Sequence, residues 1–245
     1  MIPAKVVIQA GGKGSRLYPY TKVLPKPLMP VGGMPILEIV VRQLAAQGFR
    51  DITISLGHLG DMIRLCCGDG SRWGVRIDYV TEDRPLGTIG PLKLVSGLER
   101  PFLVMNGDLL TDLDFAAFHR WHQSGNALLS IATYMKPVNV SLGVLEINDA
   151  QEVIGFREKP TLHFPCSMGV YAVNPELLDL VPAGELFGFD HLMYKMLELG
   201  LPARSYLFAG TWMDIGRPED FHQACELFER QPELFLPPEP LRKAG

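Results

Sequence analysis

Hydrophobic residues in the first half of the chain alternate between two periodicities. Lys5 to Gln9 and Asp51 to Leu56 are short β-branched apolar runs, typical of strands buried on both faces. Between them, Pro35 to Gln47 carries apolar residues at intervals of three and four, the spacing of a helix face. This half as a whole predicts strands at 5–9, 51–56, 75–80 and 101–105 and helices at 35–47, 59–67 and 91–98. The βαβα order predicts an α/β fold built on a doubly wound sheet with right-handed crossovers.

The second half favours strands first and helices later. Alternating or apolar runs predict strands at 127–134, 143–147, 152–158 and 168–173, an antiparallel or mixed extension of the same sheet. Helices are predicted at 175–180, 190–199 and 218–230. We find no repeat and no long linker, so residues 1–230 are expected to form one domain with a mixed, Rossmann-like sheet flanked by helices. Residues 231–245, which contain the run PPEP, are expected to form an irregular proline-rich tail.

Composition narrows the function classes. Apolar residues make up 47% of the 245 residues and charged residues 20%, which is ordinary for a globular protein. The formal net charge of −4 argues against a nucleic-acid-binding surface but leaves room for a small anionic ligand. No apolar run has the length of a transmembrane helix or the pattern of a signal peptide, and the four cysteines show no disulfide or zinc framework. A cytoplasmic protein with reduced thiols and no membrane partner is expected.

A glycine-rich loop follows the first predicted strand. Glycines at 11, 12 and 14 would let backbone amides approach a polyphosphate closely, and Arg16 follows them. Lys26 stands between two prolines, which stiffen the chain around it. A dinucleotide-binding fingerprint would need glycine at Leu17, and no window matches a Walker P-loop. The residues alone favour phosphate binding over a flexible surface loop only by a modest margin.

The loop resembles the signature of the sugar nucleotidyltransferases, in GGKGSRL at 11–17 and PKPL at 25–28. Ser15 replaces the threonine of that pattern and keeps the hydroxyl. The resemblance implies that Arg16 binds a nucleoside triphosphate and that Lys26 contacts the phosphates around the reacting centre. Residues 82–92 resemble the segment that reads the base in this family. The implied nucleotide-binding residues are Ala10, Gly11, Gly12, Gly14, Ser15, Arg16, Lys26, Glu82, Gly87 and Thr88.

Further segments resemble the rest of that family's site. Asp108, at the end of the fourth predicted strand, and Asp214, in the run WMDIG, resemble its two metal ligands, which implies a bound Mg²⁺. The run Glu158-Lys159-Pro160 resembles the motif that holds the sugar 1-phosphate. The implied sugar-phosphate-binding residues are Asn106, Gly143, Glu158, Lys159 and Ser167.

The resemblance thus implies a Mg²⁺-dependent transfer of a nucleotide from a nucleoside triphosphate to a sugar 1-phosphate, with release of pyrophosphate. Arg16, Lys26 and Asp108 are the implied catalytic residues. The segment 85–92 is closest to the mannose 1-phosphate and heptose 1-phosphate guanylyltransferases, so GTP is the leading donor. Gln9 departs from the usual apolar residue there, which keeps UTP, CTP and dTTP open. Many mannose-type members continue into a left-handed β-helix, for which this chain has no room.

Two other classes stay open. A metal-dependent glycosyltransferase would need a D-x-D motif, and Asp112-Leu113-Asp114 has that spelling, but it leaves the two cations of the loop unexplained. A non-catalytic nucleotide-sugar-binding protein is the other class, and relatives that have lost catalysis tend to lose the loop cations or the carboxylates. Relatives often assemble, so a homo-oligomer also stays open. His119 and His122 are expected on a solvated helix face rather than at a metal site.

Overall fold

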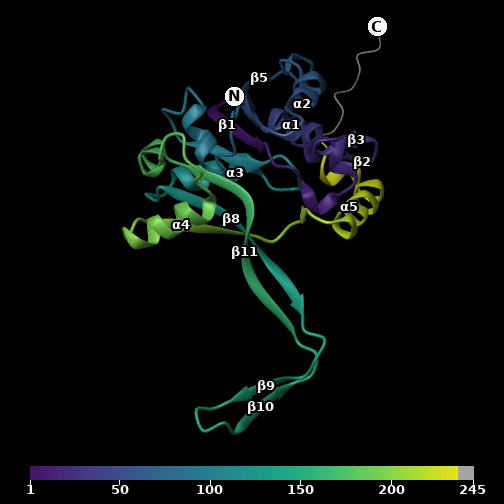
Figure 1. Ribbon diagram of the computed structural model, residues 1–245, viewed down its shortest axis with the longest axis vertical. Coiled ribbons are helices and arrows are strands. Elements are labelled where there is room, and N and C mark those ends of the chain that lie inside the picture. The colour runs from purple at the N-terminus through teal and green to yellow at the C-terminus, as the bar shows by residue number, and fades with distance from the viewer. Residues whose placement is uncertain (237–245) are drawn as a thin grey trace.

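A computed structural model describes residues 1–236 and shows a mixed seven-stranded sheet with strand order β12-β8-β11-β6-β1-β4-β5 (Figure 1). Neighbours among β1, β4, β5 and β6 pair in parallel, whereas β11 runs antiparallel to both β6 and β8. This confirms the predicted α/β fold with a mixed sheet. The strands are β1 (Ile2–Ala10), β4 (Phe49–Leu56), β5 (Arg76–Thr81), β6 (Phe102–Asn106), β8 (Leu129–Asn139), β11 (Thr161–Val173) and β12 (Ala203–Phe208).

Helices cover both faces of this sheet. The α-helices are α1 (Ile36–Ala46), α2 (Gly60–Cys67), α3 (Phe115–Gln123), α4 (Phe189–Glu198) and α5 (Pro218–Arg230). The helices predicted over 91–98 and 175–180 are 3₁₀ segments, Gly90–Leu94 and Pro175–Leu180. Segments this short gain few α-helical hydrogen bonds for the residues that they order, so the tighter turn prevails.

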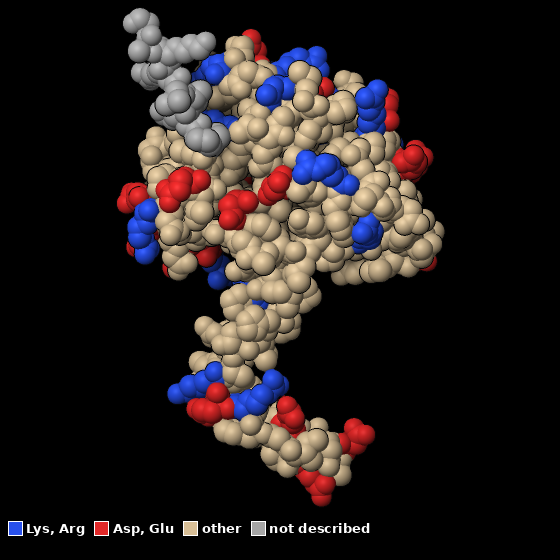
Figure 2. All heavy atoms as spheres, turned by 180° about the vertical axis from the view of Figure 1, so that it is seen from behind, with Lys and Arg blue, Asp and Glu red and all other residues tan. Residues whose placement is uncertain are grey.

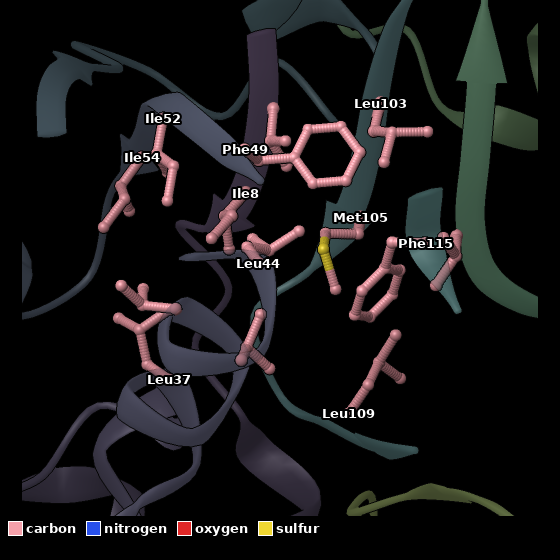
Figure 3. Packing of buried hydrophobic residues seen from close by; sticks show 14 of the residues in the cluster. Ile8, Leu37, Leu44, Phe49, Ile52, Ile54, Leu103, Met105, Leu109 and Phe115 are labelled. Carbon is pink, nitrogen blue, oxygen red and sulfur yellow. The ribbon is translucent and has the colours of Figure 1, made fainter. Parts of the chain in front are cut away.

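Alternation along β1 divides the core into two layers. Val6 and Ile8 point into the cluster covered by α1, α2 and α3, part of which Figure 3 shows around Phe49. Val7 points the opposite way, into a cluster that α4 helps to cover. Because β1 is apolar on both sides, it lies in the interior of the sheet, as its continuous apolar run predicts.

A third apolar cluster joins the two ends of the chain. Leu17 and Met29, from the stretch that follows the glycine-rich loop, pack with Ala224 and Phe228 of α5. A methyl group at Gly32 would overlap the Phe228 ring, so the backbone there lies directly against α5. The last helix therefore supports the loop predicted to bind phosphate.

The predicted tail begins with residues that pack on this cluster. Phe235 is buried and stacks on Phe228 with ring centroids 5.9 Å apart. The remainder of the predicted tail, 237–245, lies outside the described residues. The domain boundary at residue 230 stays a prediction.

One part of the chain leaves the body. The strands β8 and β11 stay paired from Thr133–Ser167 out to Asn139–Thr161, beyond the end of the sheet. There they lead into the small hairpin formed by β9 (Val144–Ile147) and β10 (Val153–Arg157). We call residues 135–166 the arm; Figure 1 shows it projecting away from the helices and the sheet.

The prediction that 143–147 and 152–158 extend the central sheet was wrong. These residues form β9 and β10, which pair only with each other within the described part of the chain. Their alternating apolar residues fit a strand but carry no information about which strand lies next to it.

The expectation of a solvated face for the two histidines of α3 was also wrong. His119 and His122 are 3% and 2% exposed, and burial lowers the pKa of each. The His119 ring bonds the Pro101 carbonyl oxygen at 3.1 Å. The His122 ring bonds Ser130 at 2.8 Å and Asn174 at 3.2 Å, so both rings are satisfied structural groups.

Candidate active site

A cavity of about 730 Å³ opens at the carboxyl ends of β1, β4 and β6. Open α/β sheets place their ligands at this edge. All ten residues of the predicted nucleotide site line it together with two residues at the end of β6: Ala10, Gly11, Gly12, Gly14, Ser15, Arg16, Lys26, Glu82, Gly87, Thr88, Asn106 and Asp108. The fold thus gathers three separate segments of the sequence around one hollow.

The floor of the cavity depends on two glycines from neighbouring strands. A methyl group at Gly57, after β4, would lie 2.5 Å from the Gly11 carbonyl oxygen. A methyl group at Gly11 would lie 2.9 Å from the Glu82 carboxylate. The His58 amide donates to the same Gly11 oxygen at 3.2 Å. No larger residue fits at either position without moving the neighbouring backbone or the carboxylate.

The glycine-rich loop curls back so that Lys26 lies beside its start. Gly14 adopts φ +60°, a conformation that glycine takes most easily, and its carbonyl accepts a hydrogen bond from the Thr21 hydroxyl at 3.0 Å. A methyl group at Gly14 would lie 3.2 Å from Cβ of Lys26. Residues twelve positions apart in sequence therefore form a single wall.

Lys26 lies between the two aspartates predicted to bind metal. Its side chain is largely buried and forms ion pairs with Asp108 and, at 3.4 Å, with Asp214. Two short strands explain this meeting, β7 (Leu109–Thr111) and β13 (Trp212–Asp214), which pair antiparallel with Asp214 opposite Leu109. The carboxylates come from distant parts of the sequence, and this ladder places them next to each other.

Arg16 approaches the same group from the loop side. A methyl group at Gly216 would lie 3.2 Å from the Arg16 guanidinium and 3.2 Å from the Asp214 carboxylate. Arg16, Lys26 and the two aspartates therefore form one cluster of alternating charge at the edge of the cavity. Such a cluster combines cations for phosphate oxygens with carboxylates for a cation.

Two carboxylates form a sparse but chemically suitable set for Mg²⁺. Mg²⁺ takes hard oxygen ligands and is commonly held by one or two carboxylates plus substrate phosphates and water. Within residues 1–236, no three His, Cys, Asp or Glu side chains come together as a closed metal site. The pair Asp108 and Asp214 fits an ion that arrives with its substrate rather than one held by the protein alone.

The segment 82–88 forms the opposite wall. The Glu82 carboxylate accepts a hydrogen bond from the Leu86 amide at 2.8 Å, and burial raises the pKa of Glu82. Gly87 has φ +80°, and a methyl group there would lie 2.8 Å from the Phe187 carbonyl oxygen. The Thr88 hydroxyl accepts from the Phe189 amide at 2.8 Å, so Thr88 caps α4 and not the 3₁₀ segment that follows it in sequence.

Gln9 carries an unpaired donor in the cavity wall. Its Nε2 is buried and has no hydrogen-bond partner among the described residues. A buried amide without a partner is costly, and a ligand acceptor in the cavity would remove that cost. The residue that departs from the family pattern therefore carries, among residues 1–236, a buried side-chain donor that is free to bond a ligand.

The predicted sugar-phosphate residues are divided between the cavity and the arm. Asn106 lines the cavity, and Ser167 lies at the root of the arm, where its hydroxyl bonds the Tyr171 hydroxyl at 3.1 Å. Gly143, Glu158 and Lys159 lie together on the exposed arm, outside the cavity. Lys159 pairs with Glu158 at 3.8 Å. Their proposed contact with the sugar phosphate stays a prediction.

The two aspartates of the D-x-D spelling have structural partners. Asp114 accepts a hydrogen bond from the Ala117 amide at 2.7 Å and caps α3. Asp112 accepts from the Thr211 amide at 2.7 Å. Neither lines the cavity, which removes the main sequence argument for a glycosyltransferase.

Sequence reasoning missed Gly57 and His58, which line the cavity. Lys13, Pro27, Asp83 and Arg84 also line it; they lie within the resembling segments but were not named as site residues. The His58 ring bonds the Thr21 carbonyl oxygen at 3.1 Å and so connects the β4 end to the glycine-rich loop. The position of these residues in the sequence could have identified them. Gly57 and His58 follow directly after a buried parallel strand, as the glycine-rich loop does after β1.

A family model described as nucleotidyl transferase matches residues 5–231. The chain belongs to this nucleotidyl transferase family. It is 32% identical to the UTP–glucose-1-phosphate uridylyltransferase of Synechocystis sp., over 90% of this chain and 62% of that protein. It is 31% identical to the mannose-1-phosphate guanylyltransferase of Mycobacterium tuberculosis, over 88% of this chain and 62% of the relative. This family member thus spans about 62% of the length of these two curated relatives.

Solved structures agree with the family. HddC from Yersinia pseudotuberculosis superimposes with a TM-score of 0.71 at 28% identity, covering 92% of this chain and 99% of that one. A putative glucose-1-phosphate thymidylyltransferase from Bacillus anthracis gives a TM-score of 0.72 at 26% identity, covering 91% and 94%. No helix of the described family member is long and apolar enough to cross a membrane.

Proposed function

We propose that this protein joins a nucleoside monophosphate from a nucleoside triphosphate to a sugar 1-phosphate and releases pyrophosphate, with GTP as the preferred donor. The observation that carries the proposal is the meeting of Lys26 with Asp108 and Asp214 at a cavity lined by the glycine-rich loop. A simple phosphate-binding loop would not need two carboxylates around its lysine. A transfer between two phosphate groups needs both signs of charge.

The donor base is the finer part of the proposal. The similar proteins include ones named as guanylyl-, uridylyl- and thymidylyltransferases. GTP is favoured by the likeness of residues 85–92 to guanylyltransferases, and a structural neighbour, HddC, has been solved with GMP-PN. Gly87 leaves backbone groups accessible to a base edge, and the free amide of Gln9 offers one further donor.

Asp108 and Asp214 would hold the Mg²⁺ ion. When bound with the triphosphate, it would neutralise phosphate charge at the reacting centre. The remaining chemistry belongs to the side chains and backbone of this chain.

The reaction needs no protein nucleophile. A phosphate oxygen of the sugar 1-phosphate, already anionic, forms a bond to the α-phosphorus as the bond to the leaving pyrophosphate breaks. The loop amides at 11–14 and Arg16 would bind the triphosphate and neutralise the departing pyrophosphate. Lys26, held by its aspartate partners, would keep a positive charge beside the reacting phosphate. Catalysis then consists of positioning and charge stabilisation.

The test is pyrophosphate release from a matrix of substrates. Each of GTP, UTP, CTP, dTTP and ATP is mixed with Mg²⁺, the protein and each of a panel of sugar 1-phosphates, including those of mannose, glucose and heptoses. We expect release with GTP and one or a few sugars. Release with another base would revise the donor alone. Nucleotide-sugar binding by titration without release in any mixture would instead identify a non-catalytic binding protein.

A further inference from the structure

The arm exposes apolar side chains that no residue of the described part of the chain covers. Phe156 is 60% exposed and Ile154 67%, although both lie in strand β10. The other exposed apolar residues of the arm are Met135, Val138, Leu142, Leu145, Ile147, Val153 and Phe164. Contiguous exposed apolar surface of this kind marks an interaction site in a folded protein.

Both edges of the arm are free as well. Pairing of β8 with β12 ends at Tyr134, and pairing of β11 with β6 ends at Val170. Beyond these points, within residues 1–236, β8 and β11 pair only with each other, and Figure 2 shows the resulting narrow stalk from the opposite side. A two-stranded ribbon is marginally stable in water by itself, so the arm needs a surface to pack on.

One face of the arm continues the wall that carries Asp214. The Tyr134 ring lies 5.6 Å from that of Trp212, which belongs to the same short strand as Asp214. Because side chains alternate along a strand, Val138 lies on the same face as Tyr134, and its cross-strand partner Leu162 joins it there. The apolar face therefore starts at the edge of the active site and runs outward.

The same arm keeps the predicted sugar-phosphate residues out of reach of the cavity of their own chain. The ladder from Ser167 to Thr161 is continuously paired and spans about 20 Å at the usual rise of a strand. Glu158 and Lys159 lie beyond its far end. At the near end, Gly169 packs against Asn106, so the ladder begins at the site and carries these residues away from it.

We propose that two copies of this chain exchange arms, so that each arm packs its apolar face on the other body and delivers Glu158 and Lys159 to the other cavity. The assignment of those two residues to the sugar phosphate rests on the proposed function. A two-fold axis makes both contacts identical and closes the assembly at a dimer. It covers the exposed face of each arm and supplies to each cavity the residues that its own chain holds at a distance.

A second copy fits this role better than the body of the same chain. Returning Glu158 and Lys159 to their own cavity would require the outer ladder to fold back sharply or to come apart, since β8 and β11 are paired at every position from Thr133–Ser167 to Asn139–Thr161 and the one irregularity lies at the root, between Ser167 and Tyr171. Exchange keeps every one of those pairs. Exchange of an identical element is a low-cost route to a dimer for this reason.

The test mixes two variants that each release almost no pyrophosphate when the sugar 1-phosphate is held well below the KM of the arm variant. One carries Lys26→Ala in the body, and the other carries Glu158→Ala with Lys159→Ala on the arm. In a mixed dimer with exchanged arms, one of the two cavities combines an intact body with an intact arm. Random co-assembly then gives about a quarter of wild-type pyrophosphate release, whereas each variant alone gives almost none. Copurification through two different affinity tags verifies that mixed dimers are present.

Three outcomes would overturn arm exchange. They are the absence of restored activity in verified mixed dimers, full activity of the arm variant alone, and a fully active wild-type monomer of 27.2 kDa by light scattering at assay concentration. If the wild type itself releases no pyrophosphate, the proposed function has failed and a cross-link decides the arm separately. Unlabelled protein with photoreactive benzoylphenylalanine at position 156 is co-assembled with ¹⁵N-labelled wild type. A cross-link to the labelled body, in a product of twice the chain mass on a denaturing gel, supports exchange; a link within one chain, which leaves the chain mass unchanged, or no link to either body, contradicts it.

Discussion

The central sheet and the arm are built from the same kinds of residue and use them in opposite ways. Phe49 is fully buried beneath the helices, whereas Phe156, on a strand of the arm, is 60% exposed. Ile8 and Ile54 are fully buried in the sheet, and Ile154 is 67% exposed. The helices of the chain cover the apolar faces of the sheet, whereas the apolar side chains of the arm are exposed. An apolar strand pattern therefore indicates that the side chains need to be buried. It does not indicate whether the residues that bury them belong to the same chain.

The largest expected difference between the two regions is in stability. Phe49→Ala should lower the free energy of unfolding by about 3–5 kcal/mol, because it leaves a cavity in a packed core. Phe156→Ala should change it by less than about 0.5 kcal/mol in dilute protein, because that ring is exposed within the single chain. Urea denaturation at low concentration measures both. A large effect of Phe156→Ala under those conditions would mean that the arm packs on its own body.

The next comparison sets a body cation against an arm cation. Lys26→Ala should reduce turnover by about 10²–10³, as expected on losing one preorganised charge at the reacting phosphate. Lys159→Ala should instead raise KM for the sugar 1-phosphate by about 10- to 100-fold and leave triphosphate affinity unchanged. Steady-state kinetics and nucleotide titration separate the two effects. His163→Ala, on the opposite face of the arm and outside the resembling motif, is the control and should be near wild type in KM.

A smaller effect is expected in the pH dependence of stability, because a histidine is buried in the interior of the body. Burial lowers the pKa of His122 below its ordinary 6.5, so the unfolded chain binds the proton more readily than the folded one. Stability should therefore be complete above about pH 6.5 and fall as the pH drops from there toward the lowered pKa of the folded state. Melting temperatures of the wild type and His122→Gln over this range test it, and the variant should show a shallower decline.

The smallest expected effect concerns the donor in the cavity wall. Gln9→Leu should weaken nucleoside triphosphate binding by about 2- to 10-fold, because the free amide of Gln9 is then absent from the site. Calorimetric titration with each triphosphate measures this loss and shows whether it depends on the base. If the variant binds every triphosphate tested as tightly as the wild type does, Gln9 does not contact the nucleotide.

Much of the fold was predictable because local patterns and global packing agree. The predicted strand at 51–56 lies within β4, and the helix predicted at 218–230 is α5. In each case a regular apolar pattern is bounded by a glycine or a proline, and these are local signals. Prediction and structure differ where the position of a segment depends on a partner that is distant in the sequence. The residues at 143–147 and 152–158 read correctly as strands, but their neighbour was assigned wrongly.

The candidate site divides in the same way. Resemblance identified Lys26, Asp108 and Asp214 one at a time, but only the pairing of β7 with β13 brings the second aspartate to the lysine. His58 was missed because its role comes from a contact with Thr21 across two segments of the fold. His122 was wrongly predicted to be solvated, because a helix pattern does not reveal that Ser130 and Asn174 lie close enough to bond its ring.

By itself the sequence indicated the order of most strands and helices, predicted phosphate binding by the glycine-rich loop and identified the family to which the chain belongs. These depend on residues that are near one another along the chain. The tertiary structure decided which carboxylates face Lys26, which amide in the cavity is left without a partner, and that the arm stands apart from the body. These depend on contacts between distant segments, and a periodic pattern records that a side chain must be covered or paired without naming its partner.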